Sequence, residues 1–180
     1  YLTAVGNTLY FSAYDGTNGY ELWKSDGTDV GTVMVRDIVS GSHGSDLASL
    51  TAVGNTLYFA ANDGTNGYEL WKSDGSSSGT LMVKDISPGI PSSNLVKLTS
   101  FGDDVYFMAN DGNSGYELWK SDGSTNGTFM VKDTGSRISN IYQQFETYII
   151  EHLHLSVLDD TLYFVANDGT NGFELWKYSL

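Results

Sequence analysis

The sequence predicts an all-β fold, a β-propeller-like array of four antiparallel repeats of about 48 residues, each four-stranded except the last. The first observation is the segment Glu-Leu-Trp-Lys-Ser-Asp-Gly at residues 21–27, which recurs at 69–75 and 117–123 and, shortened, at 174–177. The second is the spacing of its tryptophans, which is 48, 48 and 57 residues. A period in the forties is typical of propellers and related arrays.

These spacings predict a single domain with repeats at approximately 1–40, 41–88, 89–135 and 136–180. The last tryptophan interval is 57 rather than 48 residues long, so an insertion is expected within 134–154. Insertions in such arrays often mark an exposed binding face. Because this one contains Tyr, Phe and Ile, we favour a loop packed over one end of the core, with the binding face as the alternative.

Each repeat is expected to begin with a hairpin. In the first repeat, residues 2–5 and 8–13 are short apolar strands, and Gly6 and Asn7 form the turn between them. The second strand is a nearly continuous apolar run, which predicts that it is covered on both faces. It recurs at residues 57–61, 105–109 and 162–166.

The third strand is expected to follow a tight reversal. Residues 15–19 read Asp-Gly-Thr-Asn-Gly, in which Gly and Asn adopt positive φ and the Asp carboxylate accepts bonds from amides ahead of it. In the strand at 20–24, Leu22 and Trp23 point to opposite faces, since side chains alternate along a strand. This strand is therefore also predicted to be covered on both sides.

A fourth, β-branched strand is predicted at residues 32–38, with equivalents at 80–86 and 128–133. Loops at 39–46 and 87–94 have the length needed to carry the chain back to the start of the next repeat. The fourth repeat ends at Leu180, so it is expected to lack this strand.

The charge excludes two classes of partner. The formal net charge is −13, and the nine basic residues are spread over the repeats rather than clustered. Nucleic acids and anionic membranes both require clustered Lys and Arg, so neither is an expected partner. No apolar run is long enough to insert into a membrane, and the chain has no cysteine. The acidic, Gly- and Asn-rich repeats favour a secreted protein of the cell exterior.

The repeated octapeptide resembles the ELWxxDGT repeat family of bacterial proteins, and the resemblance covers essentially the whole chain. Residues 21–28 match it in full, whereas 69–76 and 117–124 end in Ser instead of Thr, and the last copy keeps only Glu-Leu-Trp. The resemblance implies a propeller-like fold and an extracellular or cell-surface setting, with no reaction and no catalytic residues. The signature residues expected to be structural are Glu21, Glu69, Glu117 and Glu174, Trp23, Trp71, Trp119 and Trp176, and Asp26, Asp74 and Asp122.

The carboxylates do not predict catalysis. They recur once per repeat, whereas an active site needs one asymmetric constellation. We expect turn-forming roles for the Asp residues, and we expect Glu21 and its equivalents to face Lys or Arg on a neighbouring strand at the surface. No catalytic residue is predicted, and the chain is interpreted as a non-enzyme.

Two weak metal hypotheses remain. Calcium fits the Asp-Gly-Thr-Asn-Gly loops because Ca²⁺ takes six to eight oxygen ligands, but no copy has the spacing of a calcium-binding loop. Hairpin turns have the same composition, so we expect no required cofactor. His152 and His154, predicted to share one face of a strand, are the transition-metal alternative, without an identifiable third ligand. The candidate calcium residues are Asp15, Asp63, Asp111 and Asp168.

The function predicted from the sequence is a structural or adhesive repeat protein that associates head to tail or through an open strand edge with copies of itself. Glycans or proteins of a cell surface are the other expected partners. The alternative is a lectin-like propeller, in which exposed Trp or Tyr rings stack on sugars. The tryptophans alternate with other apolar residues inside strands, which favours a core position between blades.

Overall fold

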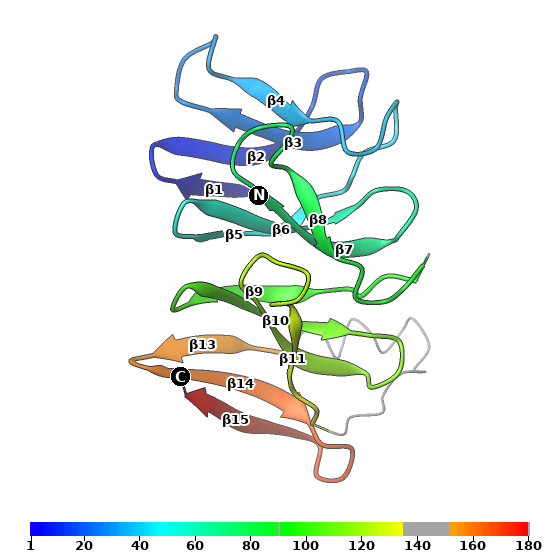
Figure 1. The fold of residues 1–180 in the computed structure, drawn as a ribbon, viewed down its shortest axis with the longest axis vertical. Coiled ribbons are helices and arrows are strands. Elements are labelled where there is room, and N and C mark those ends of the chain that lie inside the picture. Colours follow the sequence, from blue (N-terminus) through cyan, green and yellow to red (C-terminus); the bar gives the residue numbers. More distant parts are fainter. Residues whose placement is uncertain (90, 135–151, 180) are drawn as a thin grey trace.

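The computed structural model describes residues 1–89, 91–134 and 152–179 and consists of four antiparallel sheets stacked side by side (Figure 1). This confirms the predicted all-β array of four repeats, of which the last has three strands.

We call the sheets blades one to four. Blade one contains β1 (Leu2–Val5), β2 (Thr8–Tyr14), β3 (Tyr20–Ser25) and β4 (Val33–Arg36). Blade two contains β5 (Ala48–Val53), β6 (Thr56–Asn62), β7 (Tyr68–Ser73) and β8 (Leu81–Lys84). Blade three contains β9 (Val96–Phe101), β10 (Asp104–Asn110), β11 (Tyr116–Ser121) and β12 (Phe129–Lys132). Blade four contains β13 (Leu155–Leu158), β14 (Thr161–Asn167) and β15 (Phe173–Ser179).

The strands of each blade follow one another in chain order, as expected for a meander. The first strands of successive blades lie beside one another, β1 next to β5, β5 next to β9 and β9 next to β13. Blades one and four lie at opposite ends, so the described strands form an open stack rather than a closed ring (Figure 1). Each blade therefore packs only against its neighbours in the sequence.

The hydrophobic core is divided into three layers, one between each pair of adjacent blades. In blade two, the side chains directed at blade one form what we call the Trp face, and those directed at blade three form the Tyr face. Because both faces are covered, β6 is buried along most of its length, which explains its lack of polar alternation. The Trp face of blade two consists of Leu57, Phe59, Ala61 and Trp71, and its Tyr face of Tyr58, Ala60 and Leu70.

The fourth strands are shorter than predicted. Residues 32–38 were expected to be extended, but β4 covers only Val33–Arg36. The hydroxyl of Thr32 donates to the Thr28 carbonyl at 2.7 Å and so belongs to the preceding turn, while the Ile38 amide donates to the Glu21 carboxylate at 3.1 Å. Both residues are thus held by side-chain contacts that remove them from the ladder.

The predicted insertion within 134–154 lies largely outside the described residues. On its far side, Leu153 is buried in the layer between blades three and four. On its near side, the Thr134 hydroxyl oxygen lies 3.1 Å from the Asn167 carbonyl oxygen of blade four. The described ends of this segment therefore both contact the last interface.

Candidate functional site

The signature glutamates are buried anchors for the loops that follow β4 and its equivalents. Glu21, Glu69 and Glu117 are each 0% exposed. The Glu21 carboxylate accepts bonds from the amides of Ile38 and Ser45, both at 3.1 Å, and from the Ser45 hydroxyl at 2.7 Å. The expectation that it faces Lys or Arg at the surface is wrong, because the loop after β4 crosses back over β3 and its inward amides need an acceptor.

The other two copies repeat this arrangement with different donors. Glu69 accepts from the amides of Ile86 at 2.8 Å and Ser93 at 2.9 Å. Glu117 accepts from the amide and hydroxyl of Thr134 at 2.6 and 2.8 Å. Burial raises the pKa of Glu69 and of Glu117 to about 7, against the opposing effect of these donors. Glu174 of the shortened repeat is instead exposed.

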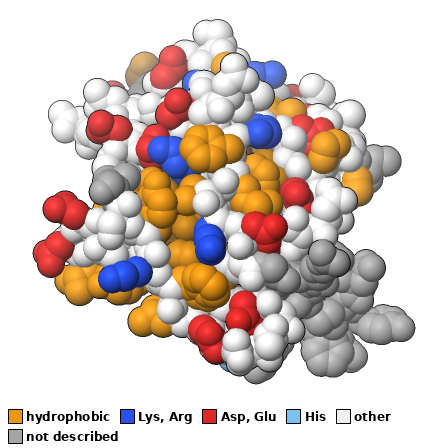
Figure 2. Space-filling model, turned by 60° about the horizontal axis from the view of Figure 1, so that its bottom comes forward, with side chains coloured by type: hydrophobic (Ala, Val, Ile, Leu, Met, Phe, Trp, Pro, Cys, Tyr) orange, Lys and Arg blue, Asp and Glu red, His pale blue; other side chains and the backbone are white. Residues whose placement is uncertain are grey.

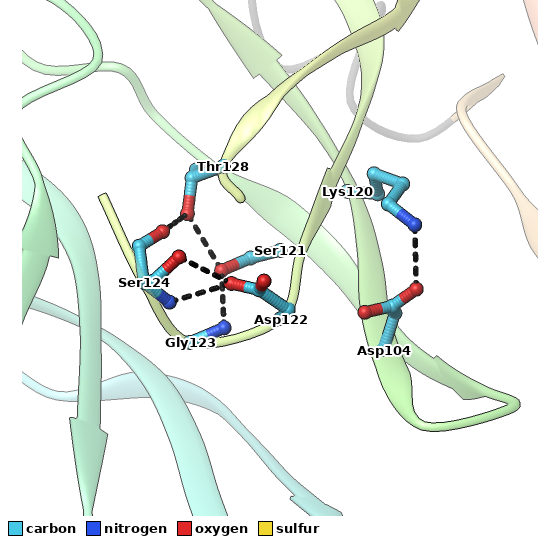
Figure 3. A network of polar contacts seen from close by, with 7 residues as sticks. All are labelled: Asp104, Lys120, Ser121, Asp122, Gly123, Ser124 and Thr128. Atoms are coloured by element: carbon cyan, nitrogen blue, oxygen red, sulfur yellow. Dashed lines mark hydrogen bonds and ion pairs between the residues drawn. The ribbon is translucent and has the colours of Figure 1, made fainter. Parts of the chain in front are cut away.

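The signature aspartates close the turn after each third strand. In blade three, Asp122 Oδ1 accepts from the amide and hydroxyl of Ser124, both at 2.7 Å (Figure 3). Beside it, the Ser121 and Thr128 hydroxyls lie 2.7 Å apart, and the Gly123 amide donates to Ser121 Oγ at 3.0 Å. The hydroxyl bond from Ser124 lowers the pKa of Asp122, so this carboxylate is a charged turn acceptor. Asp26 and Asp74 bond Thr28 and Ser76 in the same way.

The calcium candidates use their carboxylates within their own loops. Asp15 Oδ1 accepts from the amides of Thr17 and Asn18 at 2.8 and 2.9 Å, and its Oδ2 accepts from the Asn18 side chain at 2.7 Å. These bonds lower the pKa of Asp15. The same pattern of donors surrounds Asp63 and Asp168, and Asp111 accepts from two loop amides.

The histidines do not lie where the sequence predicted. His152 and His154 precede β13 rather than sharing a strand, because the fourth blade begins only at Leu155. The His152 ring stacks on Phe173 at 5.4 Å, and His154 is exposed. Within the described ranges, no group of three or more His, Asp or Glu side chains is placed to hold a metal ion.

A surface depression of about 420 Å³ lies between blades one and two. Two of its polar residues are already engaged, since Asp46 accepts from the Tyr68 hydroxyl at 3.2 Å and Asn62 accepts from the Gly64 amide at 2.7 Å. The depression is lined by Val39, His43, Gly44, Asp46, Asn62 and Gly64.

The tryptophans lie on the Trp faces of their blades. Trp71 and Trp119 are buried against the preceding blade, whereas Trp23 has no blade in front of it and is partly exposed. The charged group of a Lys or Arg from the preceding blade lies over the ring of each of the three later tryptophans, 5.4 to 5.9 Å from the ring centroid. These pairs are Arg36 over Trp71, Lys84 over Trp119 and Lys132 over Trp176.

Two exposed aromatic residues that the sequence did not single out lie side by side on β2 and β3. Tyr14 and Tyr20 face each other across β2 and β3, with ring centroids 5.7 Å apart, and are 55% and 57% exposed. The signal was present in the sequence, because Tyr14 stands where the later repeats have Asn. The pair therefore breaks the symmetry of the repeats.

Comparisons with known proteins bear on the fold alone. No protein-family model matches the chain, and no curated protein matches it in sequence. A solved structure of a mutant puromycin hydrolase in complex with PGG is similar, with a TM-score of 0.60 and 13% sequence identity. The match covers 97% of this chain and 25% of that one, so this chain spans about a quarter of that protein. The fold is propeller-like.

The described part of the structure contains no helix of the length and apolarity that a membrane span requires.

Proposed function

We propose that this chain is a non-enzymatic structural or adhesive repeat module of the cell exterior. The observation that carries this proposal is one contact made at successive interfaces. Lys24 Nζ donates to the Gly75 carbonyl of the next blade at 2.7 Å, and Lys72 Nζ donates to that of Gly123, also at 2.7 Å. Arg36 and Lys84 likewise donate to the Thr80 and Thr128 carbonyls of the next blade. These contacts recur at the first two interfaces, where they join one blade to the next.

The hydrogen bonds of the repeated carboxylates support a structural role as well. The buried Glu and turn Asp residues accept bonds from local amides in each complete repeat. A catalytic group must be free to meet a substrate and must belong to an asymmetric set. Copied, internally bonded carboxylates are suited instead to fixing loop positions.

The exterior setting rests on charge and on the repeat resemblance. A net charge of −13 keeps the chain soluble and repels anionic lipid and nucleic acid. The test is antibody labelling of intact and permeabilised cells that produce the protein, combined with protease shaving of intact cells. We expect labelling of intact cells that shaving removes. Labelling that requires permeabilisation would contradict the exterior role.

A lectin is the second candidate, and the Tyr14–Tyr20 pair favours it. Exposed aromatic rings that lie close together offer apolar faces and hydroxyl groups, both of which suit the binding of a sugar. A glycan array with the purified chain tests this. Saturable binding to one sugar that Tyr20→Ala abolishes, and that Val30→Ala leaves intact, would favour the lectin over the structural module.

A further inference from the structure

The surface depression between blades one and two lies beside the exposed Tyr14–Tyr20 pair. Gly44 lines the depression, and its backbone lies against that of Tyr20, because a Cβ added at Gly44 would come within 2.5 Å of the Tyr20 nitrogen. Tyr14 is the last residue of β2, and Asn62, which also lines the depression, is the last residue of the equivalent strand β6. The tyrosines and the depression therefore lie together at one end of the first interface.

Both tyrosine rings project from the face of blade one that is directed at blade two. Side chains alternate along a strand, so Tyr14 shares a face with Tyr10, and Tyr20 shares a face with Leu22. Tyr10 and Leu22 are buried in the layer between blades one and two. The exposure of the pair is therefore a property of this interface, and it does not depend on any neighbour at the opposite face of blade one.

The loop that lines the depression is held in place from both blades. The Ser45 amide donates to the Tyr20 carbonyl, and the Ser45 carbonyl accepts from the Asn62 amide, both at 3.0 Å. The buried Glu21 carboxylate accepts from the amides of Ser45 at 3.1 Å and of Val39 at 3.3 Å. A loop fixed in this way loses little conformational freedom when a ligand binds, which favours affinity.

The first repeat departs from the second at four residues of this site, whereas the signature Glu, Trp and Asp residues are copied. In the second repeat, Ser92 Oγ accepts from the Tyr68 amide at 3.0 Å, so that position carries a side chain where the first repeat has none. An asymmetric set of chemically different groups is what a ligand site requires. The four positions hold Tyr14, His43, Gly44 and Asp46 in the first repeat, and Asn62, Pro91, Ser92 and Asn94 in the second.

The charges around the depression favour an uncharged ligand. Among the described residues that line it, His43, Asp46 and Asn62 are polar, and none is Lys or Arg. Basic side chains stand apart from one another elsewhere too, as Figure 2 shows for one face of the molecule. A chain with a net charge of −13 also repels anions as a whole. Sialylated and uronic-acid sugars are therefore disfavoured.

The polar groups of the depression match the hydroxyl groups of a sugar. Asp46 and Asn62 each use one side-chain oxygen within the protein, which leaves Asp46 Oδ1 to accept and Asn62 Nδ2 to donate. The His43 side chain is exposed and adds a ring that can donate or accept. The apolar faces of Tyr14 and Tyr20 suit the C–H groups of a sugar ring. The volume of about 420 Å³ is within the range of small-ligand sites.

We propose that the depression between blades one and two, together with the Tyr14–Tyr20 pair, binds a neutral saccharide. The inference rests on the lectin candidate and names its site and its class of ligand. The sugar ring lies against the tyrosines, and its hydroxyl groups bond with His43, Asp46 and Asn62. Because the site is built from residues that differ between the repeats, each copy of the chain binds one saccharide here.

An array of neutral, sialylated and uronic-acid oligosaccharides, probed with the 180-residue chain, tests the class of ligand. We expect binding to neutral oligosaccharides of glucose, galactose, mannose or N-acetylglucosamine and none to the anionic ones. Titration calorimetry with the neutral oligosaccharide that gives the strongest array signal should then show one site per chain. Choline is added as a competitor, because paired tyrosines also bind quaternary ammonium groups, and no displacement is expected.

Two variants test the place of the site. Tyr14→Asn introduces the residue that the later repeats have at this position, so the fold should tolerate it. Tyr20→Ala removes the other ring. Each should weaken binding of the neutral oligosaccharide by about 10-fold or more, as truncation of an aromatic anchor does. Val30→Ala is the control, since Val30 is 90% exposed in the turn at the other end of β3. Thermal unfolding of each variant must match the wild type.

Four results would overturn the proposal. They are the absence of binding to any neutral oligosaccharide, a preference for the anionic ones, displacement by choline, and binding that both tyrosine variants retain. The last result would keep the lectin candidate but move its site elsewhere, whereas the first would remove the lectin candidate as well. Surface labelling of cells can succeed in each case, so the exterior structural role is tested separately.

Discussion

The buried glutamates hold the loops that follow β4, β8 and β12. The Glu69 carboxylate is surrounded by donors, the amides of Ile86 and Ser93, and a carboxylate is the side-chain group that accepts without donating. Desolvation opposes its charge and raises its pKa from 4.5 to about 7. Each complete repeat therefore contains one acid whose protonation is linked to folding.

Stability should consequently fall as the pH rises from about 4.5 to 7. A raised folded-state pKa means that the native protein binds the proton more tightly than the unfolded chain does. This stabilisation is complete below the unfolded pKa and is lost as the pH rises through the folded value of about 7. Urea unfolding across this window measures it.

The double variant Glu69→Gln/Glu117→Gln should flatten this pH dependence and lower stability throughout, by about 1 to 3 kcal/mol at each site, because a side-chain amide would face backbone donors. Turn aspartates such as Asp26 and Asp122 have lowered pKa values, so their effect appears at lower pH and has the opposite sign. An unchanged slope in the double variant would show that other groups cause the pH dependence.

Trp71→Ala is expected to lower the free energy of unfolding. Trp71 is 5% exposed, its ring centroid lies 6.5 Å from that of Phe59, and the Arg36 guanidinium lies over the ring. Removing a buried aromatic side chain costs about 3 to 5 kcal/mol. Thermal unfolding checks the prediction, with Trp23→Ala as the control that should cost less because no blade covers it. An unchanged midpoint for Trp71→Ala would contradict the core position.

The turns depend on close contacts between neighbouring blades. Gly75 has φ of 87° and lies against the Tyr10 hydroxyl, whereas Gly27 has φ of 92° and open space around it. Gly75→Ala should therefore lose more stability than Gly27→Ala, because both strain the backbone and only Gly75→Ala displaces the tyrosine. Equal losses in denaturant titrations would show that the inter-blade contact adds nothing.

Chelation should leave the fold nearly intact. The loops of Asp15 and Asp63 are closed by their own amides, so their geometry does not require a cation. Thermal unfolding with and without EDTA measures this. A fall in the midpoint of more than about 10 °C that Ca²⁺ restores would show metal linkage and contradict the prediction.

The sequence was sufficient for the order of the strands and the number of repeats, but not for the ends of the fourth strands or for the loops. The apolar runs of β6 and β10 predict burial on both faces, because a strand with one exposed face would alternate apolar and polar residues. The burial of Glu21 depends on Ser45, which lies 24 residues further along the chain, and no local period encodes that crossing. The repeat pattern did not predict the Tyr14–Tyr20 pair, because Tyr14 is a position at which the first repeat departs from that pattern.

The linear stack predicts unequal stability along the molecule. Blades two and three have neighbours on both faces, whereas blades one and four have one each. Native-state hydrogen exchange should therefore show slower exchange in β6 and β10 than in β2 and β14. Equal protection at concentrations where the chain is monomeric would indicate one fully cooperative unit.

The distance between Glu21 and its donor Ser45 has a consequence for biosynthesis. A nascent chain that has just completed β3 at Ser25 still lacks the Ser45 amide that this carboxylate will accept, because the chain must first be extended to residue 45. At about 5 to 20 residues per second, the delay is about 1 to 4 seconds. The Glu21 carboxylate thus receives its Ser45 donors only once the loop that leads from β4 to β5 has been translated.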